Sequence, residues 1–218
     1  LRKITDGEIG KSMLKSLDSR GVRGLAYWDN GFKMMTANKP FKTPEDMLGL
    51  KLRIQSSKVL ESQMKAWGAL PQVMAFSEVY QGLQTGVVDG TENTPSNVYT
   101  QKTHEVQKYG VFTDHGYIGY AVITNKKFWE GLPADIRTKL EKAMAEATVH
   151  ANEVAQKDND DAVAEMKKSG KIELSTPTAE ERKAWAGGAA AVHQEMAGRV
   201  GKDLMESIYK ATGFKPTK

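Results

Sequence analysis

The chain has 218 residues, 39% of them hydrophobic, which is enough for one large domain or two small ones around a core. Its 31 basic and 27 acidic side chains are well mixed and give a net charge of +4, whereas a nucleic-acid-binding protein would show a clustered basic stripe. Without cysteine it forms neither a disulfide nor a thiolate, and it has no apolar run of about 18 residues to span a membrane.

The first stretch, residues 1–17, reads LRKITDGEIGKSMLKSL, an amphipathic pattern that is typical of a helix. No secretory signal is visible in it, and the sequence begins as though in mid-structure. We therefore expect a mature, processed or truncated protein, with its signal peptide removed.

Short strands are predicted next, at residues 24–30 and 32–37, separated by an Asn-Gly turn. A small helix follows over 43–48, and a strand over 50–54 then alternates apolar with polar residues. Arg53 lies on the polar side of that strand. The pattern alone leaves two interpretations of Arg53: a solvated surface residue, or a cation that faces a cleft and binds an anion.

The middle of the chain reads as short helices and strands bounded by serine caps and glycine stops. Ser56 or Ser57 would cap the first of these helices. The predicted elements are a helix to about Trp67, a strand at 71–76, a helix at 77–86, a very short strand at 87–90 and a long strand at 116–125, GYIGYAVITN.

A long helix is predicted over residues 134–168, which contain neither Pro nor Gly and keep apolar residues at helical spacing. At 1.5 Å per residue it would span roughly 50 Å, so it either bridges two lobes or breaks once near the polar stretch QKDNDD. Thr178 and Glu181 form a capping box that opens a last helical section. Strands that alternate with helices indicate an α/β protein with a largely parallel sheet.

Motifs for catalysis and for cofactors are absent from the sequence. The four histidines have no metal-ligand spacing, and the nucleophile elbow, Walker A and dinucleotide-binding motifs are missing. The acidic stretch at 158–161 resembles half a calcium loop, but it lacks the loop's Gly and closing Glu, which favours a solvated helix face. We therefore expect no metal, no cofactor and no catalytic residue.

Several long motifs, in order along nearly the whole chain, resemble one known family. They are NGFKMMTANKP, LKLRIQSSKVLE, the run from GALPQVMAF to THEVQKY, and NKKFWEGLPADIR. With them the chain resembles the substrate-binding proteins of tripartite ATP-independent periplasmic (TRAP) transporters, in particular the C4-dicarboxylate-binding branch. The resemblance implies a periplasmic, monomeric receptor that binds a small organic acid and delivers it to the TRAP permease membrane subunits, with no nucleic-acid partner.

The architecture implied by the resemblance is that of a two-lobe periplasmic solute-binding protein, an α/β fold with hinge strands and a long lobe-bridging helix. Family members carry a long N-terminal section that forms most of the first lobe, so the first lobe is expected to be incomplete in this chain. The expected parts are residues 1–30 as the remainder of the first lobe and a hinge strand, 31–116 as the second lobe with the carboxylate-binding motifs, 117–170 as a return strand and the bridging helix, and 171–218 as a C-terminal helical section.

The resemblance also assigns a role to Arg53, because the Arg of the family's "LR" strand forms a bidentate salt bridge with the substrate carboxylate. A guanidinium suits that role, since it is planar, always charged and matches a carboxylate with two parallel hydrogen bonds. Asn93 would donate an amide N–H to the same carboxylate, and Phe76 would pack on the aliphatic part of the ligand. The structural alternatives are a turn residue for Asn93 and an ordinary core residue for Phe76.

Three further positions match residues that line the cleft in relatives. Lys33 stands where many relatives have Arg and would meet the second carboxylate, unless it is a surface lysine. Ser56 is either a cleft residue or a helix cap, and His115 is either a cleft residue or a structural histidine.

A ligand-sensing or interaction module on the same scaffold, not coupled to transport, is the alternative function, since a fold does not fix a function. An enzyme is the least favoured of the three functions, because the sequence offers no nucleophile–base pair and no set of metal ligands. The acid itself is not specified, because malate, succinate and fumarate differ by groups worth only about 1–3 kcal/mol in a pocket.

Overall fold

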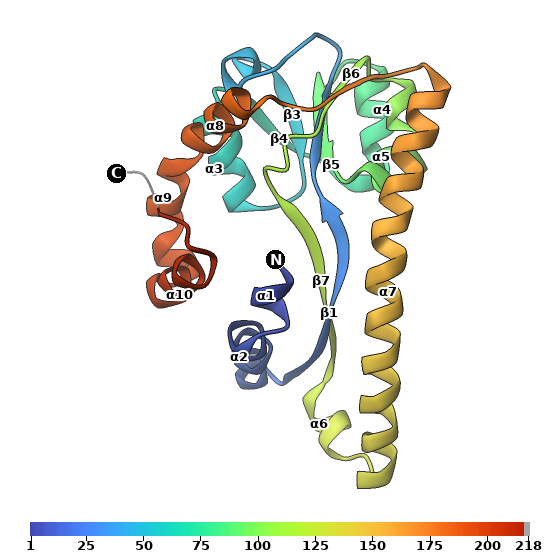
Figure 1. The fold of residues 1–218 in the computed structure, drawn as a ribbon, viewed down its shortest axis with the longest axis vertical. Coiled ribbons are helices and arrows are strands. Elements are labelled where there is room, and N and C mark those ends of the chain that lie inside the picture. The colour runs from blue at the N-terminus through green and yellow to red at the C-terminus, as the bar shows by residue number, and fades with distance from the viewer. Residues whose placement is uncertain (216–218) are drawn as a thin grey trace. The chain divides into compact units, whose positions relative to one another are not determined.

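The structure is a computed structural model that describes residues 1–215 (Figure 1). The α/β fold expected from the sequence is confirmed, and the chain divides into two units, each built from separate stretches of sequence. Unit 1 consists of Leu1–Asn30, Ile118–Lys157 and Val200–Lys215, and unit 2 of Gly31–Tyr117 and Asp158–Arg199.

Unit 2 contains a six-stranded sheet. In spatial order its strands are β4 (Leu70–Val73), β3 (Lys51–Ile54), β5 (Gly90–Asn93), β2 (Met34–Ala37), β6 (Tyr109–Val111) and β8 (Glu173–Ser175). Strand β3 is parallel to β4 and β5, and β6 is parallel to β8, but β2 is antiparallel to both β5 and β6. The predicted largely parallel sheet is therefore mixed, because alternation of strands and helices along a sequence does not fix the direction of each strand.

Helices cover both faces of this sheet. In and beside unit 2 they are η2 (Pro44–Met47), α3 (Lys58–Ala66), η3 (Phe76–Glu78), α4 (Val79–Gln84), α5 (Pro95–Thr100), η4 (Thr103–Glu105), α8 (Ala179–Gly188) and α9 (Ala190–Val200). Helices α3 and α8 lie on one face of the sheet, and α4 and α5 on the other (Figure 1). The predicted capping box of α8 is confirmed, since Thr178 and Glu181 cap each other's backbone N–H.

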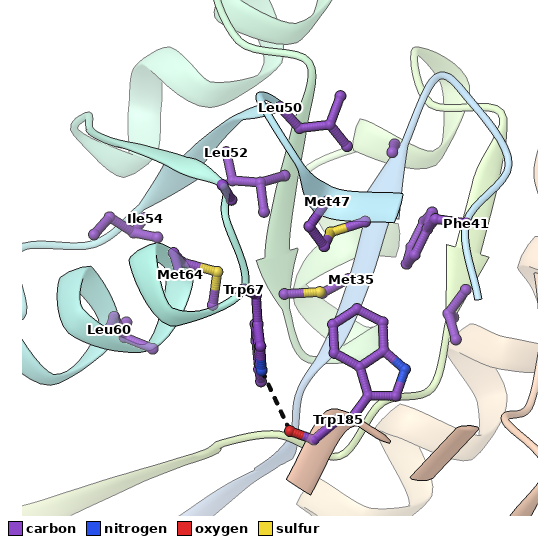
Figure 2. Packing of buried hydrophobic residues seen from close by; sticks show 13 residues of the cluster. Met35, Phe41, Met47, Leu50, Leu52, Ile54, Leu60, Met64, Trp67 and Trp185 are labelled. Atoms are coloured by element: carbon purple, nitrogen blue, oxygen red, sulfur yellow. Dashed lines mark hydrogen bonds between the residues drawn. The ribbon is translucent and has the colours of Figure 1, made fainter. Parts of the chain in front are cut away.

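The main hydrophobic core lies between the sheet and helices α3 and α8 (Figure 2). Side chains alternate along a strand, so Leu52 and Ile54 of β3 point to this face together with Met35 of β2. Two tryptophans close the cluster: the Trp67 indole N–H donates to the Trp185 carbonyl at 3.3 Å, and their ring centroids are 4.9 Å apart. A smaller cluster on the opposite face contains Met34, Val98, Met166 and Ile172.

Unit 1 is built around a two-stranded sheet of β1 (Val22–Phe32) and β7 (Tyr117–Asn125). Its helices are α1 (Arg2–Thr5), α2 (Glu8–Ser16), η1 (Leu17–Arg20), α6 (Lys126–Glu130) and α10 (Lys202–Thr212). Two hydrogen bonds join β1 to the long helix α7 (Ala134–Ser169). The Trp28 indole N–H donates to the Thr148 hydroxyl at 2.9 Å, and the Asn152 amide oxygen accepts from the Asp29 N–H at 2.8 Å.

Helix α7 runs without a break from Ala134 to Ser169. The long helix predicted over 134–168 is therefore confirmed, and the helix does not break at QKDNDD. Residues 134–157 of the helix belong to unit 1 and residues 158–169 to unit 2.

Several strand boundaries differ from the predicted ones. Strand β1 continues through the predicted Asn-Gly turn to Phe32, with Gly31 at a φ of 150°, a positive value that glycine adopts readily. The strand predicted at 71–76 ends at Val73, and the strand predicted at 87–90 is instead the approach to β5. In each case a short apolar run fits a strand and a loop equally well, so that pairing with a neighbour decides the outcome.

Gly90 lies at the centre of the sheet, where it pairs with Ala37 of β2 and Leu52 of β3. A Cβ there would lie 2.2 Å from the Thr36 carbonyl oxygen, a backbone atom that cannot move aside easily. We expect Gly90→Ala to lower the free energy of unfolding by about 1–3 kcal/mol, as measured by urea denaturation. Gly187→Ala is the matched control, because a Cβ there meets open space in helix α8 and should stabilise slightly. Equal stability of the two variants would contradict this packing.

Candidate ligand-binding site

Arg53 is buried at the middle of β3, with 3% of its surface exposed. Its Nε and Nη2 both donate to the Met74 carbonyl, at 3.0 and 2.9 Å. Burial lowers the pKa of Arg53, and the charge of nearby Glu92 raises it again in part. The solvated-surface interpretation of Arg53 is therefore wrong: this guanidinium is largely withdrawn from water.

The hydrogen bonds to Met74 use only one edge of the guanidinium. An arginine has five N–H donors, and the Nε edge takes up two of them here. The end of the fork, formed by Nη1 and the second hydrogen of Nη2, makes no hydrogen bond within residues 1–215. In the same range no carboxylate forms a salt bridge with Arg53. The free end is the geometry that a carboxylate accepts in bidentate fashion.

Phe76 lies beside this guanidinium, with the Arg53 Cζ 5.7 Å from the ring centroid. It opens the short helix η3 and is 41% exposed, so the core-residue alternative is wrong for Phe76. An exposed ring next to a buried cation presents an apolar wall and a positive charge to the same space.

Asn93 ends strand β5 and is buried. Its amide oxygen accepts two hydrogen bonds, from the Thr94 N–H at 2.9 Å and from the Asn97 Nδ2 at 2.8 Å. Two donors on one atom fix that atom as the oxygen, so the amide NH₂ is the group left for another partner. In the parallel register Arg53 pairs with Thr91, and side chains alternate, so Arg53 and Asn93 lie on the same face of the sheet.

Lys33 and His115 form a second group around Glu92, which the sequence analysis did not single out. The side chains of all three are almost completely buried. The Lys33 Nζ lies 2.5 Å from a Glu92 carboxylate oxygen, and the His115 Nε2 lies 3.5 Å from the same oxygen. The His115 Nδ1 contacts the Thr113 hydroxyl at 2.6 Å. The surface-lysine alternative is therefore wrong for Lys33, whose ammonium is paired with a buried acid.

The pKa of Glu92 reflects opposing effects. Burial alone would raise it, but the neighbouring His115 and the charge of Lys33 together outweigh burial and hold the pKa of Glu92 below its usual value. Because Met35 pairs with Glu92 across β2 and β5, Glu92 points to the face of the sheet opposite Arg53 and Asn93. The predicted residues other than Ser56 thus fall into two groups: Arg53, Asn93 and Phe76 in one, and Lys33 and His115 around Glu92 in the other.

A cavity of about 350 Å³ within unit 2 is reached by the second group. It contains Lys33 and His115, together with polar side chains that the sequence analysis did not select: Gln55, Ser57, Gln63 and His193. Ser57, not Ser56, also caps helix α3, since its hydroxyl accepts from the Leu60 N–H at 3.3 Å. Ser56 is exposed and neither caps the helix nor lines this cavity.

No single-sequence signal could have found His193 or Gln63, because only the fold places helices α3 and α9 beside the cavity. One feature of the sequence could have pointed to Glu92: it is an acidic residue within the motif DGTEN. In the structure it lies on strand β5, of which all four residues are buried. Within residues 1–215 there is no group of three or more histidine, cysteine or acidic side chains that could hold a metal ion. None of the helices described is long and apolar enough to cross a membrane.

The fold is thus α/β, and its mixed sheet carries a buried guanidinium that has no carboxylate partner among residues 1–215. Residues 1–200 match the bacterial extracellular solute-binding proteins, family 7, and the chain belongs to that family. A family of solute-binding proteins argues against the enzyme alternative.

Several relatives are named for C4-dicarboxylates or have one bound, and others in the same comparison bind different solutes, such as 2,3-diketo-L-gulonate, sialic acid and ectoine. The chain is 59% identical to the C4-dicarboxylate-binding periplasmic protein DctP of Rhodobacter capsulatus, over 97% of this chain and 64% of that protein. Among solved structures, a TRAP periplasmic solute-binding protein of Shewanella oneidensis with bound succinate has a TM-score of 0.91 at 38% identity, over 96% of this chain and 68% of the other. One from Pseudomonas aeruginosa with bound L-malate has a TM-score of 0.85 at 36% identity, over 89% and 68%. The chain thus spans 64% of the length of its curated Rhodobacter relative.

Proposed function

We propose that this chain is the ligand-holding part of a periplasmic TRAP receptor that binds a C4-dicarboxylate and delivers it to the membrane permease. The observation that carries the proposal is Arg53, a buried cation with a free bidentate end. Removing a charge from water is costly unless an opposite charge compensates it. An incoming carboxylate would supply that compensation, and a neutral ligand would not.

The neighbours of Arg53 suit an organic acid. The Asn93 amide NH₂ lies on the same face of the sheet and would donate to the same carboxylate. The exposed Phe76 ring would contact the methylene groups of a four-carbon chain. Relatives whose names specify C4-dicarboxylates, succinate and malate support this ligand class.

The resemblance assigns the second carboxylate to Lys33, with His115 and Ser56 as the remaining predicted cleft residues. Since Glu92, the partner of Lys33, points away from Arg53, a four-carbon ligand would have to meet Arg53 and Lys33 across the ends of the strands. Because Glu92 already balances the charge of Lys33, the pair would offer the second carboxylate N–H donors and little net charge. Lys33 should therefore contribute less to affinity than Arg53, whose charge has no such partner.

Calorimetric titration with succinate, L-malate and butyrate tests the ligand class. We expect 1:1 binding of both dicarboxylates, weaker binding of butyrate, and stabilisation by about 2.7 kcal/mol at a ligand concentration a hundredfold above Kd. Lys33→Gln should weaken dicarboxylate binding more than butyrate binding. The ratio of the butyrate Kd to the succinate Kd should therefore be smaller in this variant than in the parent protein. If butyrate binds the parent protein as tightly as succinate does, the dicarboxylate assignment is wrong.

An uptake experiment distinguishes a transport receptor from a ligand-sensing module, because only the receptor delivers its ligand to a permease. Spheroplasts that make only the TRAP membrane subunits should take up labelled succinate when the purified receptor is added. A ligand-sensing module would bind succinate in the calorimeter and leave this uptake unchanged.

A further inference from the structure

The side-chain amide of Asn93 offers a carboxylate two unlike groups. Its NH₂ would donate a hydrogen bond to a carboxylate oxygen, whereas its own oxygen can only accept and would repel the carboxylate. A half-turn about the last side-chain bond exchanges the two groups with almost no change in shape. The contribution of Asn93 to acid binding therefore depends on the contacts that hold its amide in one orientation.

Two donors hold the Asn93 amide in that orientation. The Thr94 N–H donates to the Asn93 Oδ1 at 2.9 Å, and since a backbone N–H cannot accept, the atom that faces it is the oxygen. The Asn97 Nδ2 donates to the same Oδ1 at 2.8 Å. If the Asn93 amide turned over, its NH₂ would face two other donors, and both hydrogen bonds would be lost. The Asn93 NH₂ itself makes no hydrogen bond within residues 1–215 and is the end left for a ligand.

Helix α5 fixes the place of Asn97. The residue lies in the first turn of this helix, where the carbonyl of the N-cap residue Thr94 accepts from the Val98 N–H at 3.0 Å. The Ser96 N–H donates to the Oδ1 of the buried Asn159, on helix α7, at 3.0 Å. The side chain of Val98 is buried in the smaller hydrophobic cluster of unit 2. Because the residues before and after it are anchored, Asn97 has only its own side chain to order when it donates to Asn93.

We propose that Asn97 is a positioning residue of the acid-binding site, which acts through Asn93 by holding the Asn93 NH₂ toward the carboxylate. The inference rests on the proposed function, because it takes the carboxylate beside Arg53 and Asn93 as the ligand group. Thr94 contributes through its backbone, so Asn97 is the side chain that determines the orientation. Affinity for acids should therefore depend on Asn97, although the ligand itself is held by other residues.

Calorimetric titration of three variants with succinate tests the proposal. We expect Asn97→Leu to raise the Kd about three- to tenfold, because the Asn93 oxygen loses one donor and the turned amide becomes populated. Asn97→Asp should raise the Kd at least about tenfold, since a carboxylate cannot donate to that oxygen and favours the turned amide. Gln101→Glu is the control for added charge: Gln101 is exposed at the end of α5, and the Kd should stay within about twofold of the parent value. An unchanged Kd in Asn97→Leu would overturn the proposal.

A double-mutant cycle separates positioning from a general structural role. In an Asn93→Ala background no amide remains to be oriented, so Asn97→Leu should then change the Kd for succinate by less than about twofold. Urea denaturation verifies that each variant is folded. If Asn97→Leu raises the Kd equally in both backgrounds, Asn97 does not act through Asn93 and the proposal is wrong.

The ligand-free protein gives a test that does not depend on acid binding. In NMR spectra of the parent protein, the Asn97 side-chain NH₂ should exchange with water at least about threefold more slowly than in Asn93→Ala, where its acceptor is gone. Equal exchange rates would overturn the proposal for Asn97. Failure of the parent protein to bind any acid would instead overturn the proposed function, and the exchange rates would still decide whether Asn97 holds Asn93.

Discussion

Arg53→Ala is expected to raise the Kd for succinate by roughly thirtyfold to several thousandfold, which corresponds to about 2–5 kcal/mol. The reason is the free end of the guanidinium, which would form two charge-assisted hydrogen bonds in a site shielded from water. Calorimetric titration of the parent protein and the variant measures the change directly.

Two companion variants make the Arg53 result specific. Arg53→Lys should recover little affinity, because an ammonium keeps the charge but cannot reproduce the planar fork. Arg182→Ala is the control for the loss of a positive charge from unit 2, since Arg182 is exposed and paired with Asp114 at 2.9 Å. Urea denaturation of each variant verifies that it is folded, because Arg53→Ala also leaves the Met74 carbonyl without its two donors. Unchanged affinity in a folded Arg53→Ala would show that Arg53 does not bind the carboxylate.

Local chemistry explains which elements could be predicted from the sequence. Some elements depend only on contacts between residues that are close in the sequence. These are the capping box at Thr178, the serine cap of α3 and the apolar periodicity of α7. Such signals hold whatever the rest of the chain does. For the same reason the single strand at 117–125 was predictable from its β-branched and aromatic composition alone.

Pairing between distant segments explains what could not be predicted. The antiparallel direction of β2 depends on where β5 and β6 lie, and no local pattern in MMTA encodes that. The end of β4 at Val73, short of Phe76, depends on how far β3 extends beside it. Short strands owe their limits to neighbours, so their boundaries are the least predictable part of the fold.

The candidate site divides in the same way. Arg53, Asn93 and Phe76 were selected because their motifs resemble those of a known family, and the register then places Arg53 and Asn93 on one face of the sheet. Glu92 was overlooked beside them, because its importance comes from Lys33 and His115, which reach it from other segments of the chain. A buried ion pair depends on two residues that are far apart in the sequence, so that neither residue alone indicates it.

Glu92→Gln is expected to destabilise the protein by about 3–5 kcal/mol. It removes the only carboxylate paired with the Lys33 ammonium among residues 1–215, and an uncompensated buried charge is far more costly than the loss of an intact pair. Urea denaturation at neutral pH measures the effect. Glu61→Gln is the control in the same unit, since Glu61 is a surface acid whose pKa is lowered to about 2 by hydrogen bonds from Lys58 and Lys65. It should change stability little.

The direction of the pH dependence gives the prediction for Glu92 a second test. Because the folded-state pKa of Glu92 is lowered, its contribution to stability is complete above the unfolded-state pKa, about 4.3, and is lost as the pH falls through the folded-state value. The parent protein should therefore lose more stability than Glu92→Gln does when the pH is lowered below about 4.3. Adding Lys33→Met to Glu92→Gln removes the unpaired ammonium and should restore much of the stability lost at neutral pH, since an apolar side chain tolerates burial there. The contrary result would be a double variant whose loss in free energy of unfolding equals the sum of the losses in Lys33→Met and Glu92→Gln. In that case Lys33 and Glu92 do not stabilise the fold as a pair.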